Sequence, residues 1–159
     1  MHNSNTRGTG LLMEWQQTRG TLVCSGDTNV IRLWDTNREV CAAEFQTEAD
    51  SCVSSLTSDK LAGDIIVVGF GDGAIKVFDR RIAPKSGVVR IWEEHRNYVQ
   101  GVKMQRGGAR ELVSCSVKGQ VKFWDIRQSR SLQTIATHEP MEAETRAFDV
   151  HDFAQVFTT

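Results

Sequence analysis

The side chains that could act as nucleophiles or metal ligands are few and widely spaced in this sequence. Four cysteines and four histidines are present, and they form none of the close pairs that structural zinc sites use. Cys24 and Cys115 fall within apolar stretches typical of buried strands, and neither can be paired with a base and an orienting group. We therefore expect no enzyme activity and no catalytic, cofactor-binding or metal site. The full set is Cys24, Cys41, Cys52, Cys115, His2, His95, His138 and His151.

A glycine-rich run and a short basic cluster are the other candidates for chemistry. The run Gly69-x-Gly71-x-Gly73 is similar to a phosphate-binding loop, but it lacks the dinucleotide-binding spacing and a following helix, so a strand–turn–strand is favoured. The basic cluster could contact a phosphate or an acidic partner, although such a short cluster is more typical of a solvated rim. Its members are Arg80, Arg81, Lys85 and Arg90.

The charge balance argues against a nucleic-acid-binding protein. The chain of 159 residues has 19 Lys and Arg against 20 Asp and Glu, a formal net charge of -1, whereas nucleic-acid binders usually carry a clear basic excess. No apolar run approaches the ~20 residues of a membrane span. The polar start over residues 1–9 lacks the apolar stretch of a secretory signal. The cysteines are expected to be buried and reduced, which favours a reducing intracellular compartment.

Three segments of the chain resemble one another without gaps. They are Gly26–Asp35, Phe70–Asp79 and Ser116–Asp125, and each ends in the pattern apolar, basic, apolar, aromatic, Asp. The aromatic position recurs at intervals of 44 and 46 residues. An apolar run precedes each segment, and a glycine-containing turn separates the two. This self-similarity indicates a repeat architecture rather than a single unrepeated domain.

Each copy has the alternation of apolar and polar residues that is typical of β-strands. The apolar runs upstream suit strands covered on both faces. Four strands fit in each copy, at about 11–16, 21–25, 30–35 and 40–45, then 52–57, 64–69, 74–79 and 88–92, then 98–104, 111–116, 120–125 and 131–136. Residues 139–144 are interpreted as a loop between copies.

A repeat of roughly 40–45 residues with four strands and a terminal Trp-Asp is the signature of the WD40 β-propeller. We therefore predict an all-β protein, with a polar segment at 1–9 and a partial WD40 propeller at 10–159. The blade-like copies span about 10–46, 51–93, 97–137 and, incompletely, 145–159. This is about three and a half blades, whereas propellers close with about 4–8. Two open blade edges are expected, and they favour poor solubility or oligomerisation.

WD40 proteins hold a blade together with a buried hydrogen-bond relay from a His through a Ser or Thr and an Asp to the Trp. His95, Ser114 and Trp124 resemble this relay in the third copy, but Lys118 stands where Asp is expected. Phe78 in the second copy has no N–H to donate, so the relays are predicted to be incomplete. The predicted structural signature consists of Asp27, Trp34, Asp35, Asp72, Phe78, Asp79, His95, Ser114, Trp124 and Asp125.

Several segments resemble one WD40 family more specifically. Gly10–Gln17, Ser25-Gly26-Asp27 and Asp79-Arg80-Arg81 after a Gly-Asp-Gly turn are similar to the Raptor family, the regulatory-associated subunits of the target-of-rapamycin kinase complex. The resemblance runs from about residue 8 to residue 159 and implies a propeller of seven blades in the complete protein.

The resemblance implies a non-catalytic scaffold or adaptor of target-of-rapamycin complex 1. Such a subunit supports substrate recruitment and nutrient-responsive growth signalling, with the kinase and its complex as partners. It implies a cytoplasmic protein recruited to the lysosomal or vacuolar membrane indirectly, with no nucleic-acid partner and no small-molecule substrate. No partner-binding residue can be carried over, because the family's known contacts belong largely to other domains. The alternative is another WD40 adaptor, such as a ubiquitin-ligase substrate receptor or a chromatin scaffold.

Overall fold

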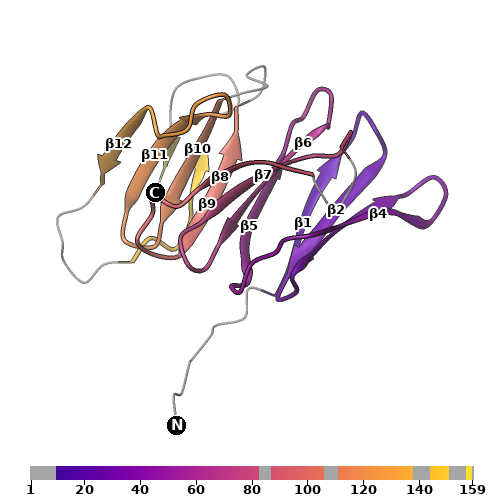
Figure 1. The fold of residues 1–159 in the computed structure, drawn as a ribbon, viewed down its shortest axis with the longest axis horizontal. Helices are drawn as coiled ribbons and strands as arrows, with labels where there is room; N and C mark the ends of the chain where they lie inside the picture. Colours follow the sequence, from indigo (N-terminus) through magenta and orange to yellow (C-terminus); the bar gives the residue numbers. More distant parts are fainter. Residues whose placement is uncertain (1–9, 83–86, 106–110, 138–143, 151–156, 159) are drawn as a thin grey trace, which may run out of the picture.

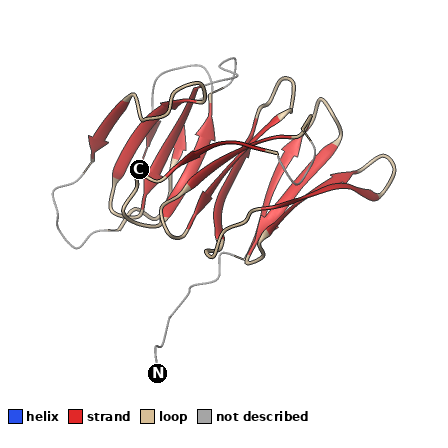
Figure 2. Cartoon of the chain, in the orientation of Figure 1, coloured by secondary structure: helices blue, strands red, loops and turns tan. Residues whose placement is uncertain are grey.

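The computed structural model describes residues 10–82, 87–105, 111–137, 144–150 and 157–158, and its regular structure is β-strand (Figures 1 and 2). Within these ranges there is no helix that is long and apolar enough to cross a membrane. The strands of the first sheet are β1 (Leu11–Gln16), β2 (Thr21–Gly26), β3 (Val30–Asp35) and β4 (Val40–Gln46). Those of the second are β5 (Val53–Ser58), β6 (Ile65–Phe70), β7 (Ile75–Asp79) and β8 (Val88–Trp92). Those of the third are β9 (Val99–Met104), β10 (Glu111–Ser116), β11 (Gln120–Asp125) and β12 (Gln133–Ala136).

Each of these three sheets is an antiparallel meander whose strand order follows the chain. Short turns join neighbouring strands, so every pairing is local in sequence. A further pair, β13 (Asp149–Val150) and β14 (Phe157–Thr158), forms a two-stranded sheet after the third. The sheets stand next to one another with their faces in contact, as the blades of a propeller do (Figure 1). The fold is a partial WD40 β-propeller.

The hydrophobic core lies in layers between successive sheets. Val23, Leu33 and Phe45 of the first sheet pack against Ile66 and Phe78 of the second, and each is fully or almost fully buried. A second layer joins the second and third sheets, and a third layer joins the third sheet to Phe148 and Val150. Because alternate residues of a strand point to opposite faces, the central sheet supplies side chains to two layers at once.

The predicted strands coincide with β1 to β12, with boundaries that differ by no more than two residues. The almost continuously apolar runs of β6 and β7 were a reliable strand signal, because both faces of the second sheet are covered. Strand structure opening the incomplete fourth copy occurs at β13 and β14. The polar segment 1–9, most of the predicted loop 139–144 and Lys85 lie outside the described residues.

The glycine-rich run is a strand–turn–strand, as the sequence predicts. Gly69 lies in β6, where an added Cβ would be 2.6 Å from the Ser55 hydroxyl and from Val99 of the third sheet. Gly73 has a φ of 96°, and an added Cβ would overlap the carbonyl oxygen of His95. These glycines therefore allow close approach between sheets rather than contact with a phosphate.

The outer face of the first sheet is exposed. Aromatic residues usually pack against a half-buried pleated surface, yet Trp15 is 46% exposed beside Leu11 and Met13, at 68% and 60%. Alternation along β1 places all three side chains on the face turned away from the second sheet. Cys41 is also exposed rather than buried, because it lies on β4, the strand at the edge of the first sheet. Only Cys115 is fully buried among the cysteines.

Candidate interaction surface

The third sheet contains a buried polar relay. The Trp124 Nε1–H donates to Ser114 Oγ at 2.8 Å, and Ser114 Oγ lies 2.6 Å from His95 Nε2. On the other side of the ring, His95 Nδ1 lies 3.2 Å from Gln120 Oε1. The loop before β9 supplies His95, whereas β10 and β11 supply the others. Since Ser114 accepts from the indole, its hydroxyl proton is directed at Nε2, and Nδ1–H donates to the Gln120 amide.

The chemistry of this relay is structural. Burial and the nearby ammonium of Lys122 lower the pKa of His95 to about 4, so the ring is neutral at physiological pH. Both ring nitrogens are engaged within the protein. The Gln120 amide oxygen accepts the hydrogen bond from the second ring nitrogen. The sequence offered no acid for this role, because Lys118 stands where the relay usually has an Asp. The relay can fix the loop before β9 onto the third sheet, and its histidine has no free nitrogen for substrate.

The other signature residues do not form relays. Trp34 is 40% exposed, and Phe78, at the equivalent position, is fully buried without a polar atom. Asp72 is exposed and accepts from the Ala74 N–H of its own turn at 2.9 Å. Asp27 is also exposed in the β2–β3 turn. The structure therefore brings together His95, Ser114 and Trp124, with Asp125 at the end of the same strand as Trp124, and leaves the remaining signature residues in the first and second sheets.

The terminal aspartates organise the turns that follow β3, β7 and β11. Asp79 accepts from the Arg81 guanidinium, with 2.6 Å between Oδ2 and Nη2, and also from its backbone N–H. Asp125 and Arg127 make the same set of contacts in the third copy. The Arg81 hydrogen bond lowers the pKa of Asp79. The pattern Asp-x-Arg, repeated in two copies, was the available sequence signal for this turn, and sequence reasoning missed it.

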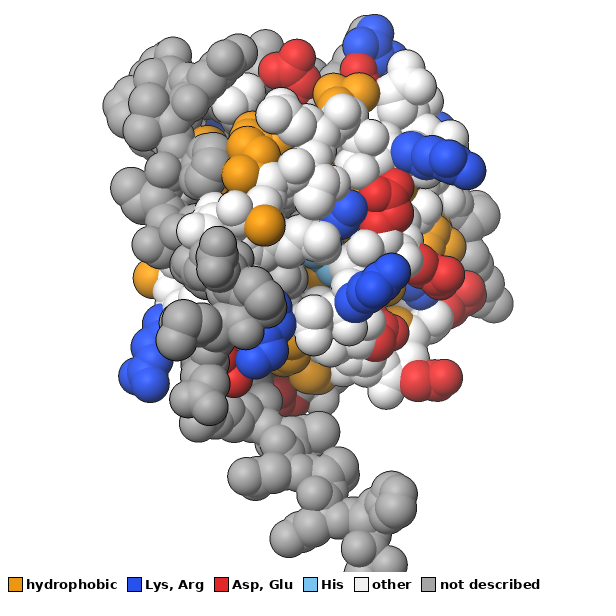
Figure 3. All heavy atoms as spheres, turned by 90° about the vertical axis from the view of Figure 1, so that its left-hand side faces the viewer, with side chains coloured by type: hydrophobic (Ala, Val, Ile, Leu, Met, Phe, Trp, Pro, Cys, Tyr) orange, Lys and Arg blue, Asp and Glu red, His pale blue; other side chains and the backbone are white. Residues whose placement is uncertain are grey.

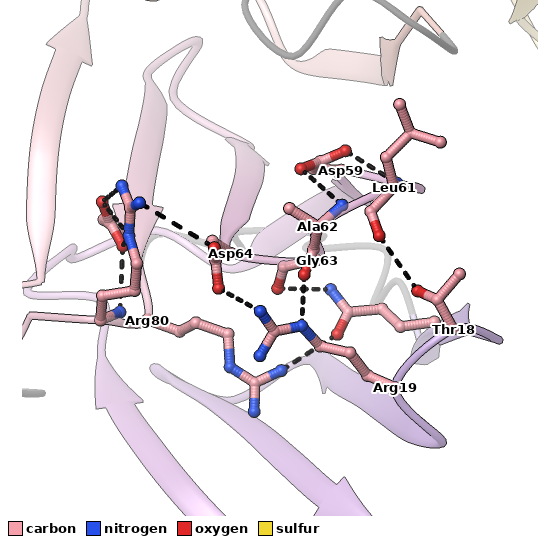
Figure 4. Close-up of polar contacts among 11 residues, drawn as sticks. Thr18, Arg19, Asp59, Leu61, Ala62, Gly63, Asp64 and Arg80 are labelled. Atoms are coloured by element: carbon pink, nitrogen blue, oxygen red, sulfur yellow. Dashed lines mark hydrogen bonds and ion pairs between the residues drawn. The ribbon is translucent and has the colours of Figure 1, made fainter.

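A polar network joins the β1–β2 turn to the β5–β6 turn (Figure 4). Arg19 donates to Asp64 Oδ1 at 2.6 Å and also to the carbonyl of Ala62. The buried Gln16 amide donates to the Gly63 carbonyl at 3.1 Å, and the Thr18 hydroxyl donates to the Leu61 carbonyl at 3.2 Å. These contacts join two successive sheets at one end, next to the end of β7.

Arg80 enters the same network from the end of β7. Its Nη1 donates to the Gln16 Oε1 at 3.2 Å, and Figure 4 shows its guanidinium beside that of Arg19. Burial, followed by the positive charge of Arg19, lowers the pKa of Arg80. Arg80 is half-buried rather than part of a fully solvated rim, which corrects the sequence interpretation.

Arg90 is a second correction to the solvated-rim interpretation. It is half-buried and donates to the carbonyls of Ile126 and Arg127 in the third copy, at 3.2 and 3.3 Å. The neighbouring Trp92 Nε1–H donates to the Gln128 carbonyl at 3.2 Å. These bonds join the second sheet to the β11–β12 turn. Arg90 therefore holds two sheets together instead of facing a partner.

No group of three or more His, Cys, Asp or Glu side chains among the described residues is arranged to hold a metal ion. On the side of the molecule that carries β12, acidic and basic side chains are interspersed (Figure 3).

The polar network between the turns is the candidate interaction surface. It is formed by Gln16, Thr18, Arg19, Asp59, Leu61, Ala62, Gly63, Asp64, Asp79, Arg80 and Arg81.

Comparison with known proteins finds similar sequences and a similar solved structure. The family described as "WD domain, G-beta repeat" matches residues 86–125. The target of rapamycin complex 1 subunit mip1 of Schizosaccharomyces pombe is 41% identical over 96% of this chain and 11% of its own length. The crystal structure of Chaetomium thermophilum Raptor superimposes with a TM-score of 0.87 and 43% identity, covering 93% of this chain and 14% of that one. The chain is homologous to the Raptor family.

Further matches extend this similarity. The target of rapamycin complex 1 subunit KOG1 of Saccharomyces cerevisiae is 42% identical over 80% of the chain and 8% of its own length. The chain thus spans only about a tenth of the curated relatives it matches. A structure of the mitotic checkpoint complex, at 20% identity and a TM-score of 0.75, shares the fold alone.

Proposed function

We propose that this Raptor-family chain provides propeller blades to a non-catalytic scaffold subunit of target-of-rapamycin complex 1. The observation that carries the proposal is 41–42% identity to two fungal subunits of that complex. The superposition on a Raptor crystal structure supports it at the level of the backbone.

The chemistry of the side chains fits a scaffold. The His95 imidazole is neutral and bonded on both nitrogens, so it is unsuited to proton transfer. Burial raises the pKa of the Cys115 thiol, which opposes formation of the nucleophilic thiolate. The polar contacts instead join turns of successive sheets. Such contacts make the surface rigid, which suits a scaffold that binds other proteins.

In this proposal the partners are the target-of-rapamycin kinase and its complex. The subunit supports substrate recruitment and nutrient-responsive growth signalling. It acts in the cytoplasm and reaches lysosomal or vacuolar membranes through other proteins. Neither a nucleic acid nor a small-molecule substrate is proposed as a ligand.

The test is affinity purification of the full protein under gentle lysis. We expect the target-of-rapamycin kinase to co-purify with the wild-type protein. Trp124→Ala, which removes a fully buried ring, should reduce recovery of the kinase, whereas Trp34→Phe at the exposed equivalent position should not. Absence of the kinase from the wild-type purification would refute the proposal. Recovery of a cullin or its adaptor would instead support a ubiquitin-ligase receptor.

A further inference from the structure

Arg80 is a half-buried cation that forms no ion pair among the described residues, although the Asp64 carboxylate lies near enough to attract it. Its guanidinium makes one hydrogen bond, to the neutral amide oxygen of Gln16. A guanidinium has five N–H donors in a planar fork, so most of the Arg80 donors have no partner among the described residues. A cation removed from water without a counter-charge is costly unless a ligand supplies that charge.

The carboxylates of the network are already engaged by other groups. Asp64 pairs with Arg19 at 2.6 Å, and Asp79 pairs with Arg81 at 2.6 Å. The Asp59 carboxylate accepts from two backbone N–H groups of its own turn and points away from Arg80 in Figure 4. Glu14, on β1, pairs with Lys60. Arg19, Arg80 and Arg81 thus share the carboxylates of Asp64 and Asp79, and Arg80 is the arginine that forms no ion pair with either of them.

The third copy shows that the turn does not require a cation at this position. Its Asp125 and Arg127 make the same contacts as Asp79 and Arg81, but the residue between them is Ile126, which packs against the core. The Asp-x-Arg contact thus stabilises the turn whether the central side chain is charged or apolar. The fold explains Arg81 and leaves the charge of Arg80 unexplained.

We propose that Arg80 binds an oxyanion side chain of a partner protein, either a carboxylate or a phosphorylated hydroxyl. The planar guanidinium fork matches the two oxygens of either group. The adjacent positive charge of Arg19 makes the site more attractive to an anion and less tolerant of a second cation. The proposal assigns a ligand chemistry to one site and stands whether or not the chain serves target-of-rapamycin complex 1.

The test uses immobilised pools of random nonapeptides with a fixed central glutamate, phosphoserine, glutamine or lysine. The full chain should bind the glutamate or phosphoserine pool roughly 10- to 100-fold more tightly than the glutamine pool, as expected for a charge-assisted hydrogen bond. Stronger binding to phosphoserine than to glutamate would assign a phosphorylated partner, and equal or weaker binding would assign a carboxylate.

Arg80→Ile, which installs the residue of the third copy, should abolish the preference for the acidic pools. Arg80→Glu should reverse it in favour of the lysine pool. The matched control is Arg38→Ala, because Arg38 is an 81% exposed arginine in the equivalent turn of the first copy, and this variant should keep the preference. Circular dichroism verifies folding, and Arg80→Gln repeats the test if the isoleucine variant unfolds. An acidic preference that survives loss of Arg80, or none in the wild-type chain, would overturn the proposal.

Discussion

Because of the relay in the third sheet, the same substitution, Trp to Phe, should lower the free energy of unfolding by very different amounts at two positions. Trp124 and Trp34 occupy equivalent positions of the repeat, but Trp124 is 1% exposed and Trp34 is 40% exposed. Trp124→Phe removes the N–H that donates to Ser114 and leaves the His95–Ser114 contact in place. Trp34→Phe removes an indole that makes no hydrogen bond with another described residue.

The magnitude follows from two losses at Trp124. The missing hydrogen bond to a buried hydroxyl costs about 1–1.5 kcal/mol. The smaller ring also forfeits about 1.5–2 kcal/mol of burial and cavity free energy beside Trp92, whose ring centroid lies 4.7 Å away. Trp124→Phe should therefore cost about 3 kcal/mol in the free energy of unfolding, against less than about 0.7 kcal/mol for Trp34→Phe at its exposed site.

Urea unfolding followed by far-ultraviolet circular dichroism measures both variants against the wild-type chain. Ser114→Ala alone and combined with Trp124→Phe completes a double-mutant cycle, with an expected coupling of about 0.5–1.5 kcal/mol. The reasoning is refuted if the two tryptophan variants lose equal stability. If Trp124→Phe loses stability but shows no coupling to Ser114→Ala, the loss comes from packing and not from the hydrogen bond.

Other predictions concern pH and backbone conformation. Because the pKa of His95 is lowered to about 4 in the folded chain from 6.5, its contribution to stability is present above pH 6.5 and is lost as the pH falls towards 4. The loss is ~3 kcal/mol, and urea midpoints at pH 7, 6 and 5 should decline for the wild type and stay flatter for His95→Gln. Gly73→Ala should cost more than about 2 kcal/mol, because its Cβ would overlap the His95 carbonyl. Gly10→Ala, at a φ of 67° with nothing within 4 Å, should cost about 1 kcal/mol in the same urea-unfolding assay; equal losses would contradict the steric argument.

The strands of this fold could be predicted from the sequence because both the alternation and the repeat specify them. Isoleucines and valines of β6 and β7 are buried on both faces, which leaves little ambiguity. The exposure of Trp15 could not be predicted, because alternation fixes which residues share a face but not whether another sheet covers that face. Alternation along β8 allows either Ile91 or Trp92 to face the next sheet, and it is Trp92 that is buried there, with its ring centroid 4.7 Å from that of Trp124.

The candidate interaction surface could not be predicted, because it is formed by contacts between residues that are far apart in the sequence. Arg19 and Asp64 are 45 residues apart and meet only when two turns lie at the same end of adjacent sheets. The Arg80-Arg81 pair was visible in the sequence, but its two members have different environments. Arg81 is held by Asp79, whereas Arg80 contacts a glutamine from another sheet.

The second sheet is covered by a neighbouring sheet on each face, and this arrangement determines how the chain should open. Phe45 and Phe78 contact across one interface, and Trp92 and Trp124 contact across the next. In stacked repeats, the cooperative free energy resides largely in such nearest-neighbour interfaces. A unit with two interfaces opens only after one of its neighbours has opened. Amide protons of β6 and β7 should therefore exchange with solvent most slowly, and those of β1 should exchange earliest.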